Sequence, residues 1–234
     1  MGTFRQALSD SDIEWIHKQK VYFVSTAPLN KGGHVNASPK GYDTLRVLNG
    51  NRIVFLDGRG SGCETISHLR ENGRITVMLC AFEGSPRIMR LFGTGTVYEP
   101  GTSEFDSLFS EHYASEWGSA EKLKLVRTII DIKVHLVGQS CGFAVPLMNF
   151  ESERKTLVNS YKSETEEVIA KKCNRDNSFS IDGIPSFIKG TSGTKTKAKI
   201  KHGLVSATGT LLPWVGGAAL GAAIALAAVR SVFK

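Results

Sequence analysis

The sequence predicts a mainly β domain with flanking helices, an α+β arrangement, followed by one C-terminal helix of the transmembrane type. Six apolar or alternating runs have the composition of β-strands, at residues 21–27, 34–39, 52–57, 74–82, 87–98 and 127–137. Helical periodicity separates only some of these runs, so the order lacks the regular strand–helix alternation of a parallel sheet. An uncharged stretch over residues 211–229 has the length needed to cross a bilayer.

The N-terminal elements are predicted from spacing and turn residues. Residues 10–20 are expected to form a helix because Ile13 and Ile16 share one helical face. Residues 21–39 are expected to form a β-hairpin, since two β-rich runs flank the turn sequence at 30–33.

The central elements continue in the same way. The apolar strand 52–57 leads into a glycine-rich loop, 58–62, and then into a helix over 63–72 that Gly73 ends. A long apolar strand follows at 74–82. This succession places a flexible loop directly before a helix start.

The remaining elements complete an antiparallel barrel with helices covering its ends. Gly93 and Gly95 predict a bend or bulge in the strand 87–98. Residues 102–127 are expected to be mostly helical, and residues 151–174 are expected to form a charged helix. The predicted domains are therefore a barrel over 1–185, a basic flexible linker over 186–210, and an anchor helix over 211–230.

The positive charge lies in the tail. Seven of the 29 Lys and Arg residues, and none of the 22 Asp and Glu residues, follow residue 184. Residues 1–184 are therefore formally neutral, although the whole chain carries a net charge of +7. A neutral body offers no basic footprint for phosphates, so no nucleic-acid partner is predicted.

The apolar tail is predicted to anchor the chain in a membrane. Trp214 suits the interface, and basic residues flank the segment at 195–201 and at Arg230. The first ten residues lack a signal peptide, so the domain is expected to face the cytosol, with the tail inserted after synthesis into a mitochondrial or peroxisomal membrane. The alternative is an Ala- and Gly-rich helix that packs on protein or lies on a surface.

Two short motifs could carry chemistry. The loop 59–65 places backbone N–H groups and hydroxyls at a helix start, which suits an anion; its alternative is a tight turn that needs glycine anyway. Residues 138–142 match the G-x-S-x-G pattern of hydrolases, but that pattern needs a helix after Ser140 and a later His, and only His202 follows. A buried, small apolar role is expected for Cys141. No metal spacing occurs among the His and Cys residues.

Five segments together resemble the pyridoxamine 5′-phosphate oxidase-like, FMN-binding split-barrel proteins. Residues 22–41 resemble their opening hairpin, and residues 52–82 resemble their next strand, phosphate-side loop, helix and long strand. Residues 87–99 resemble the following strand. The sequences SCGFAVP and SIDGIP, at 140–146 and 180–185, resemble a subgroup of the family. The resemblance covers roughly residues 5–185.

The resemblance implies a six-stranded split barrel, a homodimer, and FMN held at the dimer interface. The residues that it assigns to the cofactor are Lys40, Ser61, Gly62, Thr65, Arg90, Ser140 and Cys141. Three positions depart from the family: Glu64 and Thr65 stand where an Arg-Lys pair is usual, and Ile88 stands where a Gln usually contacts the flavin. Classical pyridoxamine phosphate oxidase activity is therefore not expected.

The sequence thus leads to two hypotheses. The first is an FMN-binding, oxidoreductase-type homodimer tethered to a membrane, with an unknown small-molecule substrate and no identifiable acid–base catalyst. The alternative is a non-enzymatic binding module whose pocket has lost FMN or holds haem or a deazaflavin. Convergence of Lys40, Ser61 and Thr65 on one concave site would favour the first, and a collapsed or carboxylate-lined site would favour the second.

Overall fold

The computed structural model describes residues 2–191. The predicted anchor at 211–230 and most of the predicted linker lie outside these residues. Within the described part, no helix combines the length and the apolar character that a membrane crossing requires.

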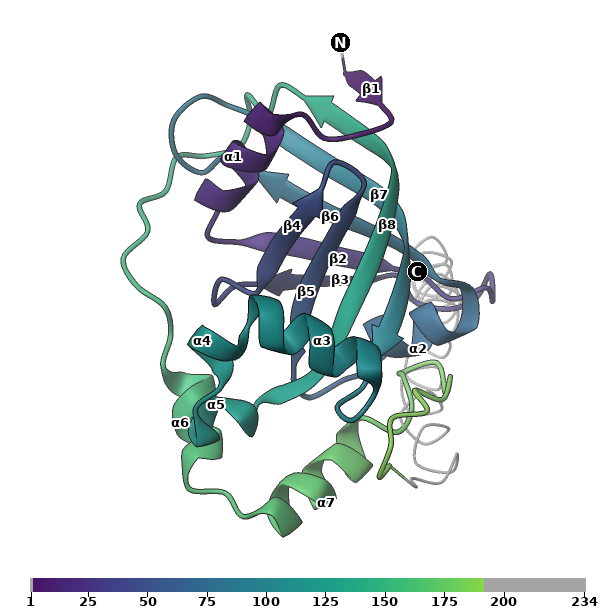
Figure 1. The fold of residues 1–234 in the computed structure, drawn as a ribbon. Helices are drawn as coiled ribbons and strands as arrows, with labels where there is room; N and C mark the ends of the chain where they lie inside the picture. Colours follow the sequence, from purple (N-terminus) through teal and green to yellow (C-terminus); the bar gives the residue numbers. More distant parts are fainter. Residues whose placement is uncertain (1, 192–234) are drawn as a thin grey trace, which may run out of the picture.

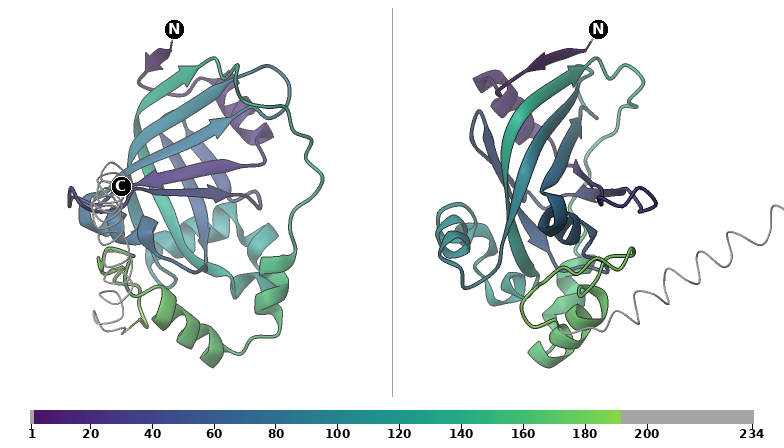
Figure 2. Two further views of the ribbon diagram at one scale, coloured as in Figure 1. Left: turned by 180° about the vertical axis from the view of Figure 1, so that it is seen from behind. Right: turned by 90° about the vertical axis from the view of Figure 1, so that its right-hand side faces the viewer.

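The described chain folds around one antiparallel sheet that curls into a split barrel (Figures 1 and 2). In sheet order, the strands are β3 (Asn36–Lys40), β2 (Tyr22–Thr26), β6 (Arg74–Cys80), β7 (Ile88–Tyr98), β8 (Val126–Ser140), β5 (Arg52–Gly58) and β4 (Leu45–Asn49), and β1 (Thr3–Arg5) pairs with β8. The six predicted strands are all present. The predicted number of six is nevertheless wrong, because β1 and β4 bring the sheet to eight strands.

The strand β5 explains why the barrel needs flanking helices. Ile53, Val54, Phe55 and Leu56 are each 0–2% exposed, so both faces of this strand are covered. Ile53 and Phe55 belong to the core inside the barrel, and Val54 and Leu56 belong to a second core under the later helices. A continuous apolar run is the pattern expected of a strand buried on both faces.

The predicted bend in β7 lies at Gly93. The pairing of β7 with β8 shifts register between Phe92 and Gly93. A Cβ atom at Gly93 would lie 2.7 Å from the backbone oxygen of Lys133, so only glycine fits where the two strands approach.

The first two helices begin and end close to the predicted residues. The helix α1 (Asp10–Lys18) starts with a capping box between Ser9 and Asp12. The helix α2 (Glu64–Asn72) ends at Gly73, whose φ of 71° is the left-handed conformation that glycine adopts readily.

The two longer helical predictions are divided into shorter helices. The predicted stretch 102–127 contains α3 (Ser103–His112), α4 (Ala114–Trp117) and α5 (Ala120–Leu123). Tyr113 separates α3 from α4, and Gly118 with the N-cap Ser119 separates α4 from α5. The predicted stretch 151–174 contains α6 (Thr156–Lys162) and α7 (Glu166–Asp176). In Figure 1, α3 and α4 cover the lower part of β5 and β8.

The chain after β8 returns to the start of α2. Residues 141–155 form neither helix nor strand and run along one side of the barrel to α6 (Figure 1). After α7, residues 177–188 reach the loop between β5 and α2, where Asn177 donates a hydrogen bond to the backbone oxygen of Gly60. A segment late in the sequence thereby becomes part of the wall around this loop.

Candidate functional site

A cavity of about 560 Å³ lies where β3 ends, the glycine-rich loop follows β5, and α2 begins. This volume is typical of a small-molecule site. The cavity brings together four of the predicted site residues, which are Lys40, Ser61, Gly62 and Thr65. It also contains residues that the sequence did not single out, among them Asn36, Tyr42, Trp117 and Arg127.

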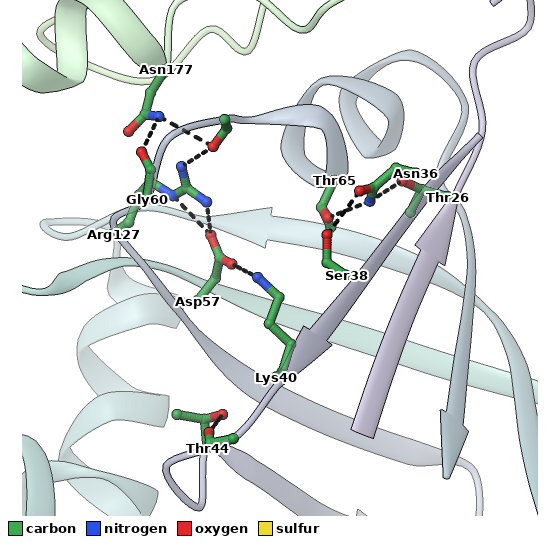
Figure 3. Close-up of polar contacts among 12 residues, drawn as sticks. Thr26, Asn36, Ser38, Lys40, Thr44, Asp57, Gly60, Thr65, Arg127 and Asn177 are labelled. Carbon is green, nitrogen blue, oxygen red and sulfur yellow. Dashed lines mark hydrogen bonds and ion pairs between the residues drawn. The ribbon is translucent and has the colours of Figure 1, made fainter. Parts of the chain in front are cut away.

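A buried ion-pair group stands beside the cavity (Figure 3). Asp57 is fully buried, and its Oδ2 atom accepts hydrogen bonds from Nε and Nη2 of Arg127 at 2.8 and 2.7 Å. Its Oδ1 atom lies 3.0 Å from Nζ of Lys40. Burial raises the pKa of Asp57, but the charges of Arg127 and Lys40 outweigh it, so the pKa lies below its usual range. The group therefore holds two cations and one carboxylate.

This group changes the expectation for Lys40. The family resemblance assigns the ammonium group of Lys40 to the cofactor. In the structure this group forms an ion pair with Asp57. The Lys40 side chain is still 23% exposed and lines the cavity, so an anion can approach it without breaking the ion pair.

A chain of hydrogen bonds orients Thr65 (Figure 3). Nδ2 of Asn36 donates to Oγ1 of Thr26 at 3.1 Å and to Oγ1 of Thr65 at 3.0 Å. Oγ1 of Thr26 also bonds Nδ1 of His68, a fully buried residue whose pKa burial lowers. Because Oγ1 of Thr65 accepts from Asn36, its own hydroxyl hydrogen remains available to an acceptor in the cavity. His68 is thus a buried structural residue that supports this chain of hydrogen bonds.

The start of α2 lacks a side-chain cap. The N-cap residue Cys63 makes no side-chain hydrogen bond to the helix amides. The first N–H groups of a helix have no partner within the helix, so an uncapped start favours an anion. Burial raises the pKa of the Cys63 thiol to about 11, which keeps it protonated and removes it as a nucleophile.

The carboxylate of Glu64 lines the cavity but is held by the later segment. Its Oε1 atom accepts a hydrogen bond from the backbone N–H of Ile181 at 3.2 Å. Arg59 does not neutralise it, because Nη1 of Arg59 donates to Sγ of Cys173 at 2.8 Å. Glu64 therefore links α2 to residues 177–188 and adds a negative charge at the cavity wall.

Asn177 and Arg127 fix the shape of the glycine-rich loop (Figure 3). Asn177 is 1% exposed, and its Nδ2 atom donates to the backbone oxygens of Gly60 and Gly62 at 3.0 and 3.2 Å. Nη1 of Arg127 donates to the same Gly62 oxygen at 2.7 Å. The backbone oxygens of Gly60 and Gly62 thereby both have hydrogen-bond partners. Sequence reasoning missed Asp57, Arg127 and Asn177, which no local pattern connects.

The three other predicted site residues lie elsewhere. Nη1 of Arg90 donates to Oγ of Ser140 at 3.4 Å. Ser140 is the last residue of β8, a strand of 15 residues. Arg127, which lines the cavity, is the second residue of the same strand. At ~3.3 Å per residue, the two ends of such a strand are roughly 45 Å apart. Arg90, Ser140 and Cys141 are therefore not brought to this cavity within one chain.

The structure overturns one expectation about residues 138–142, the burial of Cys141. Cys141 is exposed rather than buried. Irregular chain rather than a helix follows Ser140, so the strand–helix elbow of a hydrolase is absent from this described segment.

Comparison with known proteins agrees with the fold. The family model described as pyridoxamine 5′-phosphate oxidase matches residues 11–141. The pyridoxamine 5′-phosphate oxidase family protein ustO of Aspergillus flavus is 42% identical over 158 residues, which are 67% of this chain and 61% of that protein. The chain thus matches about three fifths of the length of this curated relative.

The comparison with solved structures finds, among others, two bacterial proteins. HupZ of Group A Streptococcus has a TM-score of 0.43 and 16% identity, covering 55% of this chain and 91% of that one. A Clostridium acetobutylicum protein related to general stress protein 26 has a TM-score of 0.42 and 12% identity, covering 59% of this chain and 89% of that one. Because the family model matches more than half of the chain, this protein belongs to the pyridoxamine 5′-phosphate oxidase family.

Proposed function

We propose that the protein is an FMN-binding, oxidoreductase-type homodimer tethered to a membrane. The observation that carries the cofactor proposal is the single cavity that gathers Lys40, Ser61, Gly62 and Thr65 at the uncapped start of α2. A bound flavin would supply hydride or electron transfer, and the residues of this chain would bind and orient it.

The charges around the cavity fit a phosphate group. Lys40, Arg59 and Arg127 line the cavity, and the carboxylates of Asp57 and Glu64 offset two of these three cations. A phosphate would complete this balance and would accept hydrogen bonds from the hydroxyl groups and from the first amides of α2.

The homodimer proposal accounts for the residues outside the cavity. Arg90, Ser140 and Cys141 cannot reach a cofactor bound in their own chain, but a second copy can present them to it. The outer face of the sheet has suitable apolar surface: Phe4 is 69% exposed beside Gly138, and Phe92 lies partly exposed on the same side. Such a face is typical of a protein–protein contact.

The cofactor proposal is tested by adding FMN to the purified full-length chain and recording the visible absorption spectrum after gel filtration. We expect the two-banded flavin spectrum to elute with the protein, in a fraction whose mass corresponds to a dimer. A colourless protein peak, with all FMN eluting later, would contradict the proposal.

A variant at Glu64 distinguishes a phosphate site from another use of the same cavity. Glu64→Gln keeps an oxygen for the Ile181 amide and removes one negative charge, so FMN should bind several-fold more tightly at low salt. Glu14→Gln, on the exposed side of α1, serves as the matched control and should leave the affinity unchanged. Quenching of FMN fluorescence measures both, and an equal affinity for all three proteins would argue against a phosphate beside Glu64.

The second candidate function is a non-enzymatic binding module. The pairing of Lys40 with Asp57 favours it, because that ion pair reduces the positive charge available to a phosphate. On this proposal FMN fails to bind in the titration, whereas haem or a deazaflavin binds and gives its own absorption band.

The membrane proposal rests on the uncharged stretch 211–229 and its basic flanks. The full-length chain is expected to stay with membranes after alkaline carbonate washing, and a chain that ends at residue 191 is expected in the supernatant. Fractionation of mitochondria and peroxisomes then tests the two proposed organelles. Release of the full-length chain by carbonate would contradict a spanning anchor.

A further inference from the structure

A second cavity, of about 890 Å³, lies beside α1 and shares no lining residue with the first. Its walls come from the end of α1 and the residues that follow it, 18–21, from the β6–β7 loop at 82–87, and from residues 148–150. Figures 1 and 2 show these three segments close together at the α1 end of the barrel. The volume again suits a small molecule.

The walls of this second cavity are largely apolar and aromatic. They include Trp15, Val21, Phe82, Met148 and Phe150. The backbone N–H of Met148 donates to the backbone oxygen of Phe82 at 2.9 Å, and the N–H of Phe150 donates to Oε1 of Glu83 at 3.1 Å. These two bonds hold residues 148–150 against the β6–β7 loop, so the wall does not depend on apolar contact alone.

One guanidinium group is fixed at the edge of the aromatic wall. Cζ of Arg87 lies 4.7 Å from the ring centroid of Trp15, and the side chain is 17% exposed. Nη2 of Arg87 pairs with Asp12 and donates to Oε1 of Gln139 at 3.0 Å. Nε of Arg87 is buried and has no partner among the described residues. An orphaned buried donor is unfavourable, so an acceptor at this position would be stabilised.

The local charge is positive. Asp12 receives two guanidinium groups, those of Arg5 and Arg87, so one positive charge remains. Burial raises the pKa of Asp12, but hydrogen bonds from the Ser9 backbone and from both arginines outweigh it and hold the pKa at about 2. Lys18 and Lys20 also line the cavity. Glu83 is the single carboxylate among the lining residues, and it already accepts from Phe150.

We propose that this cavity is a second small-molecule site, and that it binds a planar aromatic anion such as an aryl carboxylate. The aromatic walls would bury the ring system, and Arg87 would receive the carboxylate. Arg87 contacts Gln139, which follows Gly138 in β8 and therefore faces the opposite side of the sheet from Phe4 and Phe92, so this site lies away from the outer face proposed for dimer contact. The site does not depend on FMN binding in the first cavity.

The test is isothermal titration calorimetry of the full-length chain with 2-naphthoate, and with 2-naphthamide as its neutral counterpart. We expect saturable binding of 2-naphthoate, about tenfold weaker binding of 2-naphthamide, and no change when FMN is present in excess. Absence of saturable binding, equal affinity for the two compounds, or displacement of 2-naphthoate by FMN would each overturn the proposal.

Two variants locate the anion. Arg87→Gln should weaken 2-naphthoate binding about tenfold and leave 2-naphthamide unaffected. Because this variant also removes a partner of Asp12, Lys20→Gln at the rim provides an independent test, with a smaller loss specific to the anion. Lys122→Gln is the matched control, since Lys122 also stacks on a tryptophan, Trp117, but lies outside the cavity. Unchanged binding in both cavity variants would overturn the assignment.

Discussion

Replacement of Asp57 by Asn is expected to lower the free energy of unfolding by about 3–5 kcal/mol, the usual effect of leaving a buried charge without its partner. Arg127 is 5% exposed and donates two hydrogen bonds to Asp57, so a neutral side chain leaves its guanidinium without an anion. Lys40 loses its carboxylate at the same time. Urea denaturation near neutral pH, followed by far-ultraviolet circular dichroism, measures the loss.

The pair between Arg52 and Asp131 gives a matched control. It joins the same two strands, β5 and β8, and its arginine also donates through Nε and Nη2, at 3.1 and 2.8 Å, although to the two different oxygens of Asp131. Arg52, however, is 45% exposed, so Asp131→Asn should cost about 1 kcal/mol or less. Equal losses in the two variants would show that burial of the Asp57 group does not determine its contribution.

The contribution of Asp57 to the free energy of unfolding should also depend on pH. Its pKa is lowered in the folded protein, so its contribution is fully present above the ordinary range of an Asp, at ~4, and is lost as the pH falls through the folded pKa. The wild-type protein should therefore lose stability in acid more steeply than Asp57→Asn, and the difference between the two should shrink below pH ~4.

Replacement of Asn177 by Ala is expected to loosen the glycine-rich loop and to weaken FMN binding by about tenfold or more. The change removes both hydrogen bonds from Asn177, so the Gly60 oxygen loses its partner while the Gly62 oxygen keeps Arg127. Loss of a buried partner of this kind costs about 1–3 kcal/mol of stability. Fluorescence titration with FMN and urea denaturation measure the two effects separately.

The control for Asn177 is Asn159→Ala on the exposed surface of α6, which should change neither quantity. A variant of Asn177 that is destabilised yet binds FMN with wild-type affinity would contradict a role for the loop conformation in binding. Normal stability and normal affinity together would show that the described hydrogen bonds contribute little.

The strands were predictable where the side chains alternate or form long apolar runs, and the exceptions have physical reasons. β1 has three residues, too few for a periodic pattern, and it is stabilised by pairing with a distant strand. β4 carried a usable signal, because Asn49-Gly50 between two apolar runs is typical of a tight hairpin. The long helical predictions failed because glycine and capping residues within them end one helix and begin another.

The site was predictable only where its residues are close in sequence. Ser61, Gly62 and Thr65 belong to one loop and helix start, so their proximity follows from local structure. Asp57 and Arg127 are 70 residues apart, and Asn177 is 117 residues from Gly60. In the sequence, a carboxylate at the end of an apolar strand usually indicates that the strand has reached solvent. The burial of Asp57 could therefore be recognised only once its partners Lys40 and Arg127 were known from the structure.

The position of Asn177 has a consequence for biosynthesis. The last strand of the barrel ends at Ser140, and Asn177 leaves the ribosome later than all eight strands. At a translation rate of ~5–20 residues per second, Asn177 is synthesised a few seconds after the last strand of the barrel. The glycine-rich loop lacks its Asn177 hydrogen bonds during that time. If the proposed FMN site is correct, FMN is expected to bind only after α7 has been translated. A chain that stops where the family model ends would retain the strands without the finished pocket.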